Sequence, residues 1–466
     1  MTALGRCALA LLGVLLTVAA PAPGLMAHTV PHGTAALPSP PDPPPLRTAP
    51  PAGRAPGPAP GLRAPQHCTP PAGEGPLADP STHTEGPLAG PSRDTEGPLA
   101  DPSRDTDVAQ RLQLAAVHQL AVGDGQLIAV IDTGIYPHER LGIRLRAGGD
   151  YLTGGDGRSD CDGHGTKVAG LLAAAPSPHD ELVGIAPAAE LLAIRHSSQV
   201  FETPGPDGEL RHAGDVRTLA EAIVFAVRRQ SGVINISEAA CLPPTRAAVE
   251  GASLQAALRF AAQHDVVVVA AAGNAGVGGC TVDGGPDQVS VPGWYGDDVL
   301  AVAAVDPDDA PAPFTVPGPW VDVAAPGTAL RSLAVGGQLT SDGVEGTSFA
   351  APWVAGLAAL VRQRFPDLTA IQVTDRIRAT ARRPAGGRDD AIGYGVVDPV
   401  AALTAEPAVL EPASEDRDPP TADLRGTAPV PPPRTPGAPF DVLAVVAMLG
   451  VAGVATALLR RRPGRG

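Results

Sequence analysis

Four short segments of the sequence contain the residue types that nucleophilic hydrolysis requires. In chain order they supply Asp132, His164, Asn274 and Ser348. A serine hydroxyl is a weak nucleophile until a neighbouring imidazole accepts its proton, and a carboxylate can orient that imidazole and stabilise its positive form. We therefore assign Ser348 as the nucleophile, His164 as the general base and then general acid, and Asp132 as the residue that orients His164.

The surrounding segments, taken together, favour this assignment. Alone, a serine at a helix start is usually a cap, Gly-Asn usually marks a turn, and an aspartate after a strand is often a turn residue. The joint occurrence of all four residues in this order favours catalysis over these structural roles. The segments are Val130–Gly134, Asp162–Thr166, Ala271–Asn274 and Gly346–Pro352.

The anion that develops during acyl transfer needs hydrogen-bond donors. The Ala-rich apolar run Phe349–Leu357 predicts a buried helix that begins near Ser348. Its N-terminus would supply positive potential and backbone donors. The side-chain amide of Asn274 would donate to the same oxygen, so Asn274 is the predicted oxyanion-hole residue.

Short apolar runs alternate with helical patterns along the middle of the chain. Helices are expected at Val108–His118, Leu219–Arg229 and Leu254–Gln263. The apolar runs are typical of buried parallel strands, expected at Leu127–Ile131, Leu191–Ile194, Val233–Ile236, Val266–Val269 and Val299–Val302. This alternation predicts an α/β fold with a doubly wound parallel sheet and helices on both faces. Active residues of such sheets gather at the carboxyl ends of strands, where Asp132 and Asn274 fall.

Composition and charge narrow the possible functions of the 466-residue chain. Its 54 prolines concentrate at both ends, which leaves residues 108–403 as a single domain of a size that one core can support. The net charge of -15 argues against nucleic-acid binding, because phosphates would need a basic surface.

The N-terminal region has two predicted parts. Residues 1–27 have the shape of a secretory signal peptide, with Arg6 before an apolar run. Residues 28–107 form a Pro/Gly-rich extension with three 11-residue repeats, Glu74–Thr84, Glu85–Thr95 and Glu96–Thr106. Glycine and prolines in each repeat exclude a continuous helix, so an extended or disordered spacer is expected.

The C-terminal region predicts a membrane anchor. Residues 404–439 form a Pro-rich linker, and residues 440–459 contain the uninterrupted apolar run Val442–Leu459, long enough to cross a bilayer. The basic tail, residues 460–466, should stay on the cytoplasmic side. We expect a single-pass cell-membrane protein with an extracytoplasmic catalytic domain and a cytoplasmic C-terminus.

Cysteine usage agrees with export. After loss of Cys7 with the signal peptide, four cysteines remain, and an even number favours two disulfides with three possible pairings. The absence of a CxxC motif argues against zinc. Asp306–Asp309 favours an exposed turn over a calcium loop. No metal and no cofactor are therefore expected.

The motifs resemble a known family. Asp132-Thr-Gly, His164-Gly-Thr and Gly346-Thr-Ser-Phe-Ala-Ala-Pro352 look like the three signature motifs of subtilisin-like serine proteases, in the order of that family. Within it the sequence most resembles the mycosins, membrane-anchored proteases of type VII secretion systems in actinobacteria. The marks of this resemblance are Asp160–Thr166, Val183–Pro187, Ile194–Ser198 and Ile234–Ser237 leading to Cys241.

The resemblance implies further site residues. It implies that Cys68 pairs with Cys161, strapping the extension onto the catalytic domain without plugging the site, and that Cys241 pairs with Cys280. The substrate-binding residues would be Ser237, Glu238, Ala239 and Ala240, where subtilisins usually have Ser-Leu-Gly-Gly. Glu238 would either favour a basic substrate residue or face solvent, and the loss of both glycines argues against broad specificity.

The leading hypothesis is therefore a membrane-tethered serine endopeptidase that cleaves few protein substrates of a type VII secretion system. One alternative is a structural component that stabilises the secretion membrane complex. Another is a general surface protease, which the changed substrate-binding residues disfavour.

Overall fold

A computed structural model describes residues 39–65, 68, 108–205, 207–281, 287–341 and 343–406. All of them belong to one compact unit, which ends at Glu411. The predicted signal peptide, repeats, membrane segment, tail and all but the first residues of the linker lie outside the described residues. Within the described ranges, no helix has the length and hydropathy needed to span a bilayer.

A seven-stranded sheet forms the centre of this unit, in the order β11-β10-β8-β6-β1-β3-β2. Every neighbouring pair is parallel, so the predicted α/β class is confirmed. The strands are β1 (Leu127–Asp132), β2 (Leu145–Asp150), β3 (Glu190–Arg195), β6 (Val233–Ile236), β8 (Val267–Ala271), β10 (Leu300–Val305) and β11 (Val323–Pro326). Their carboxyl ends lie at one edge of the sheet.

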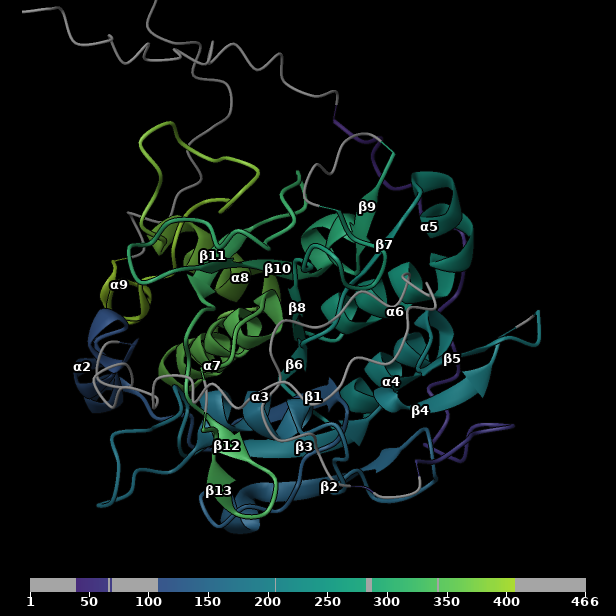
Figure 1. Cartoon of the computed structure of the whole chain (residues 1–466). Coiled ribbons are helices and arrows are strands. Elements are labelled where there is room, and N and C mark those ends of the chain that lie inside the picture. Colours follow the sequence, from purple (N-terminus) through teal and green to yellow (C-terminus); the bar gives the residue numbers. More distant parts are fainter. Residues whose placement is uncertain are drawn as a thin grey trace, which may run out of the picture. The chain divides into compact units, whose positions relative to one another are not determined.

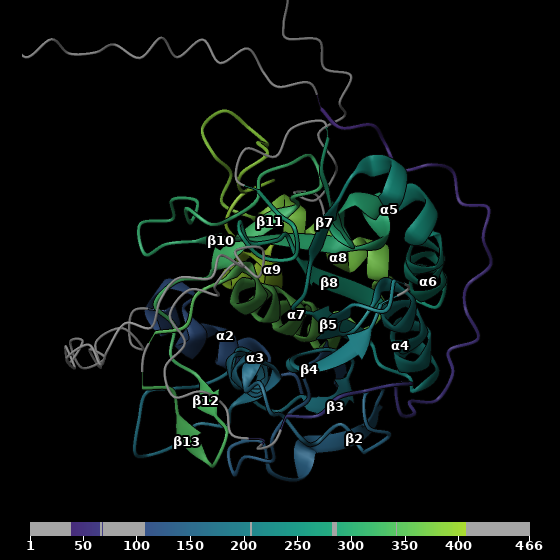
Figure 2. The same cartoon turned by 45° about the vertical axis from the view of Figure 1, so that its right-hand side comes forward.

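Helices cover both faces of the sheet (Figures 1 and 2), which explains why the strand sequences are apolar at consecutive positions. Ile128 and Val130 of β1 belong to the hydrophobic cluster that contains α3 (His164–Ala173) and α7 (Thr347–Arg364). Ala129 and Ile131 belong to the cluster on the opposite face, with α4 (Val216–Arg228) and α6 (Ala252–Gln263).

The other elements pack around this core. Helices and turns are α2 (Leu114–Leu120), η1 (Gly142–Arg144), α5 (Pro244–Glu250), η2 (Gly293–Asp298), α8 (Ala370–Thr380) and α9 (Pro399–Thr404). The small two-stranded sheets join β4 (Ser198–Pro204) to β5 (Leu210–Ala213), β7 (Ala240–Leu242) to β9 (Val289–Val291), and β12 (Leu333–Ala334) to β13 (Gln338–Leu339).

The single helix predicted at Val108–His118 is wrong. Residues 108–111 are helical, but Gln113 adopts a left-handed conformation (φ 53°), and α2 begins only at Leu114. A non-glycine residue in this conformation interrupts the helical path, so the apolar residues on either side belong to separate segments.

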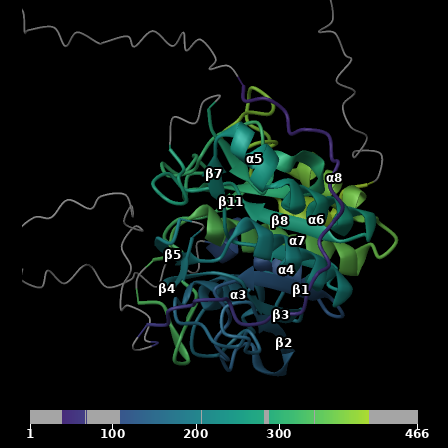
Figure 3. The same ribbon diagram turned by 90° about the vertical axis from the view of Figure 1, so that its right-hand side faces the viewer.

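Residues 39–65, which we call the strap, run across the surface of the domain past α6 and α4 (Figures 2 and 3). Trp294 Nε1 donates to the carbonyl of Pro41 (2.9 Å), and the backbone N–H of Arg54 donates to Glu221 of α4 (2.7 Å). Farther along, Arg63 exchanges backbone hydrogen bonds with Glu202 of β4. Hydrogen bonds therefore hold the strap on the surface of the domain, and the strap forms no helix or strand of its own.

Candidate active site

Asp132 and His164 meet because β1 ends beside the start of α3. His164 Nδ1 lies 2.7 Å from Asp132 Oδ1, which also accepts a hydrogen bond from the Thr133 N–H (2.7 Å). The Asp132 side chain is fully buried, whereas that of His164 is 23% exposed. A carboxylate fixed by the backbone and facing Nδ1 leaves Nε2 as the ring nitrogen that can exchange protons with another group.

The pKa of His164 is raised by its surroundings. Burial lowers the pKa, because it disfavours the charged imidazolium, but the charge and hydrogen bond of Asp132 more than offset this effect. Glu238 also raises the pKa, and Lys167 lowers it. The arrangement stabilises the imidazolium, the form that a general base reaches after accepting a proton.

Asp160 positions both partners of this pair. Its buried carboxylate accepts hydrogen bonds from the Thr133 hydroxyl (2.9 Å) and from the backbone N–H groups of Gly163 (2.8 Å) and Thr166 (2.9 Å). Thr166 is the third residue of α3, so Asp160 acts as the N-terminal cap that this helix otherwise lacks. Burial raises the pKa of Asp160 to about 6, although hydrogen bonds from Thr166 and Thr133 lower it.

Ser348 and Asn274 face the same small space beside Gly346. A Cβ added to Gly346 would lie 3.0 Å from Ser348 Oγ and 3.2 Å from Asn274 Nδ2. Gly346 has a φ of 147°, a conformation that favours glycine, and α7 begins at the next residue. The His164 ring contacts the ring of Phe349, which follows Ser348, with centroids 5.0 Å apart.

The amide of Asn274 has a fixed orientation. Its Oδ1 accepts hydrogen bonds from the N–H (2.9 Å) and hydroxyl (2.8 Å) of Thr347, so Nδ2 is left facing the space beside Gly346. A donor held in this manner beside a serine hydroxyl at a helix N-terminus can stabilise an oxyanion formed when that hydroxyl attacks a carbonyl.

The loop after Asn274 is anchored to the residues predicted to bind substrate. Within the loop, the Val277 N–H donates to the Asn274 carbonyl (3.1 Å), and the Cys280 N–H donates to Val277 (3.0 Å). Cys241 donates to the Gly278 carbonyl (2.8 Å) and forms a disulfide with Cys280. The second disulfide joins Cys68 to Cys161, so the structure contains the two pairs that the resemblance implied.

Residues 237–240, which we call the edge segment, connect β6 to β7. Ser237 is buried and accepts a hydrogen bond from Asn235 Nδ2 (2.9 Å), whereas Glu238, Ala239 and Ala240 are half-buried. The sequence left open whether Glu238 faces solvent or favours a basic substrate residue, and in the structure its side chain has partners within the protein. Its carboxylate accepts a hydrogen bond from Ser197 Oγ and lies 3.1 Å from His196 Nδ1.

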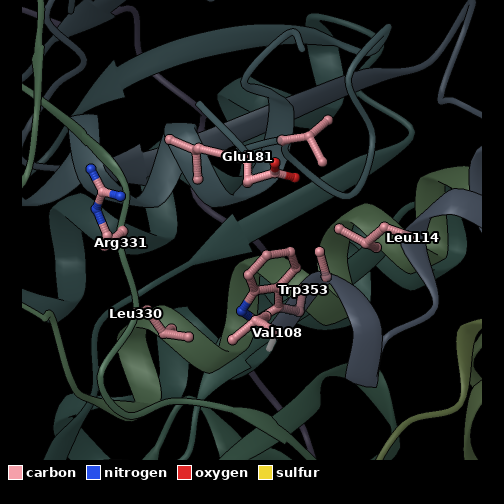
Figure 4. A pocket seen from close by; sticks show the side chains of 9 residues that line it. Val108, Leu114, Glu181, Leu330, Arg331 and Trp353 are labelled. Atoms are coloured by element: carbon pink, nitrogen blue, oxygen red, sulfur yellow. The ribbon is translucent and has the colours of Figure 1, made fainter. Parts of the chain in front are cut away.

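Two further observations bear on ligand sites. A small pocket, lined by Val108, Leu114, Glu181, Leu330 and Trp353 among others (Figure 4), contains none of the predicted site residues. Asp306–Asp309 forms a turn in which Asp309 pairs with Arg111 and Arg382. Among the described residues, no cluster of acidic, histidine or cysteine side chains is arranged to hold a metal ion.

Sequence reasoning missed the roles of Asp160 and His196. Both residues stand in segments that resemble the mycosins, Asp160–Thr166 and Ile194–Ser198. Asp160 carried only a weak local signal, because a cap is expected directly before a helix and Asp160 lies four residues before His164. His196 carried no such signal, since its partner Glu238 is 42 residues away.

Comparisons with known proteins identify the family to which the chain belongs. The family model described as the subtilase family matches residues 123–395. The chain is 43% identical to mycosin-4 of Mycobacterium tuberculosis over 383 residues, which cover 77% of this chain and 82% of that protein. Its structure is similar to that of the MycP3 protease from the type VII (ESX-3) secretion system, with a TM-score of 0.65, 39% identity, and coverage of 79% and 100%. It is also similar to a chain of an intact ESX-5 inner membrane complex, with a TM-score of 0.66, 36% identity, and coverage of 90% and 97%.

Proposed function

The chain belongs to the subtilase family and, within it, to the mycosins, and from this premise we propose that it is a membrane-tethered, extracytoplasmic serine endopeptidase of a type VII secretion complex. The observation that carries the catalytic part is the arrangement of four side chains. Ser348 Oγ and Asn274 Nδ2 border one small space beside Gly346, and the ring of Phe349 after Ser348 contacts that of His164, the partner of Asp132.

The proposed mechanism assigns a role to each of these groups. Ser348 Oγ attacks the carbonyl carbon of a peptide bond while His164 Nε2 takes the hydroxyl proton, and Asp132 stabilises the resulting imidazolium. Asn274 Nδ2 donates a hydrogen bond to the oxyanion. His164 then gives its proton to the leaving amine, which yields an acyl-enzyme, and water repeats the sequence to release the carboxylic acid and restore Ser348.

The location of this activity rests on two supports. The apolar run Val442–Leu459 followed by arginines favours a C-terminal anchor with the catalytic domain outside the cytoplasm. The similar solved chains belong to secretion systems, one of them to an inner membrane complex. Proteins moved by such a system are therefore the proposed substrates.

A scaffolding role is the second candidate, favoured by the presence of a similar chain in an intact ESX-5 inner membrane complex. The two candidates are separated by complementing a strain that lacks this protein with wild type or with Ser348→Ala, and then measuring secretion and substrate cleavage. A protease function predicts that Ser348→Ala leaves the substrates uncleaved. Full secretion with uncleaved substrates would assign secretion to the scaffold role, and cleavage by Ser348→Ala would overturn the catalytic assignment.

A further inference from the structure

The strongest unexplained feature near the site is the contact between His196 and Glu238. His196 follows β3 directly and is only 3% exposed, and its backbone N–H donates to the carbonyl of Asp132 (2.8 Å). Glu238 belongs to the edge segment, and its side chain is 25% exposed. The contact therefore links the strand end next to the catalytic aspartate with the residues proposed to bind substrate.

Hydrogen-bond partners define the protonation state of His196. Nδ1 lies 3.1 Å from a carboxylate oxygen of Glu238, and Nε2 lies 3.0 Å from the carbonyl oxygen of Asp215. The carbonyl oxygen can only accept, and so can the carboxylate oxygen while Glu238 is ionised. Thr218 Oγ1, 3.1 Å from Nε2, has its own acceptor in Asp215 Oδ1 (2.9 Å). With an acceptor facing each nitrogen, the geometry around His196 is the one that an imidazolium requires.

His138 provides an internal comparison at similar burial, with 5% of its surface exposed. Its Nδ1 accepts a hydrogen bond from the backbone N–H of Arg140 (3.1 Å), and its Nε2 faces the carbonyl of Gln338 (3.2 Å). One donor and one acceptor suit a neutral imidazole. The two histidines therefore differ in their hydrogen-bond partners and not in their burial.

The charges around His196 and Glu238 agree with a protonated His196. Burial lowers the pKa of His196, but Glu238 and then Asp215 raise it, and the net shift is upward. Burial raises the pKa of Glu238, whereas His196, Ser197 and the charge of His164 lower it, with a net downward shift. Asp215 in turn lies 3.6 Å from Arg217. Both directions agree with an anionic Glu238 beside a cationic His196.

We propose that His196 is a specificity-determining positioning residue, which as an imidazolium neutralises Glu238 and so prevents the edge segment from selecting basic substrate residues. This inference rests on the proposed protease function. Ala239 and Ala240 carry no charge. With Glu238 neutralised, the edge segment therefore presents no net charge to the substrate. Loss of the His196 proton would convert the same segment into one that prefers lysine.

The test uses the full-chain protein and peptidyl diphenyl phosphonates, which label the nucleophilic serine. Matched probes carry lysine or the isosteric, uncharged norleucine at one of the positions N-terminal to the reactive group. In wild type at neutral pH the two labelling rates should be similar. In His196→Gln the lysine probe should gain about fivefold over norleucine, the effect of one partly exposed ion pair.

Three controls make the result specific. His138→Gln should leave the ratio of the two rates unchanged, and His196→Gln combined with Glu238→Gln should return it to the wild-type value. Raising the pH through the pKa of His196 should increase the ratio in wild type but not in Glu238→Gln. A folded His196→Gln variant with an unchanged ratio at every probe position would overturn the proposal.

A measurement without catalysis separates this inference from the proposed function. Nitrogen-15 NMR shifts of the imidazole rings at neutral pH should show His196 doubly protonated and His138 singly protonated, with Ser348→Ala giving the same result. A neutral His196 would refute the inference even in an active protease. An absence of all labelling, with an NMR-confirmed imidazolium, would instead count against the protease function.

Discussion

At the residue scale, the site depends on which atoms already have partners. Asp132 Oδ1 is occupied by His164 Nδ1 and Thr133, and Asn274 Oδ1 is occupied by Thr347. These bonds leave His164 Nε2 and Asn274 Nδ2 to act on a substrate. The proposed catalytic roles therefore follow from which atoms of these groups already have hydrogen-bond partners. The residue types alone do not determine those roles.

The raised pKa of His164 predicts the pH dependence of Ser348 reactivity. Only neutral His164 can accept the serine proton, so the rate of labelling by a fluorophosphonate should rise as the pH increases through a midpoint above 6.5. In Asp132→Asn the midpoint should move to lower pH, since the carboxylate that stabilises the imidazolium is lost. The rate should also fall on the order of 10⁴-fold, as in other serine-protease triads. A midpoint unaffected by Asp132→Asn would contradict the assigned pair.

At the element scale, two short connections place the reactive groups. Asp160 fastens the turn after β1 to the first turn of α3, and the Cys241–Cys280 disulfide fastens the loop after Asn274 to β7. Both connections join segments that follow the carboxyl ends of strands, where a parallel sheet gathers its functional residues. The precision of the site thus comes from links between loops as well as from the sheet.

The disulfide should matter for turnover through Asn274. Asn274→Ala is expected to lower the rate roughly 100- to 1000-fold, the range known for this donor in subtilisin, a member of the same family. Replacing Cys241 and Cys280 by serine should lower the rate of the wild type as well, because the loop carrying Asn274 loses an anchor. In the Asn274→Ala background the same replacement should have little further effect on the rate.

The double-mutant comparison has a stability control. Loss of this disulfide should lower the free energy of unfolding by about 4 kcal/mol in the chain-entropy treatment, with or without Asn274. Assays well below the unfolding transition therefore isolate the effect on rate. Equal rate losses in both backgrounds would show that the disulfide does not act through Asn274.

The sequence predicts those parts of this structure that local pattern determines. Five strands were expected close to their observed positions, because burial on both faces makes their residues apolar in succession. The edge strand β2 (Leu145–Asp150) was not expected, since its glycines and exposed positions break that pattern. The environment of Glu238 could not be read either, because its partners come from other elements and a carboxylate looks the same in sequence whether paired or free.

At the scale of the whole domain, the strap joins separate parts of the surface. Its hydrogen bonds reach η2 near Trp294, α4 at Glu221 and β4 at Glu202, and none of them involves a predicted catalytic residue. Disulfide Cys68–Cys161 fastens the chain just beyond the strap to the segment before His164. We therefore expect the strap to contribute to stability and to leave the chemistry unchanged.

Two glycines of the strap provide a matched test. Gly53 has a φ of 60°, and a Cβ there would lie 2.5 Å from Val224 Cγ1 of α4, whereas a Cβ on Gly57 would meet nothing within 4 Å. Gly53→Ala should lower the free energy of unfolding by about 1–3 kcal/mol, and Gly57→Ala should change it by less than about 1 kcal/mol. Chemical denaturation measures both values. A decrease in fluorophosphonate labelling of folded Gly53→Ala would contradict the separation of strap and site.

The central claim is that Ser348 is a nucleophile activated by His164. Its most direct test is to react the purified full-chain protein with a fluorophosphonate and to locate the adduct by peptide mass spectrometry, with Ser348→Ala alongside. We predict a single stoichiometric adduct on Ser348 and none in the variant. An adduct on another residue, or equal labelling of Ser348→Ala, would contradict the claim.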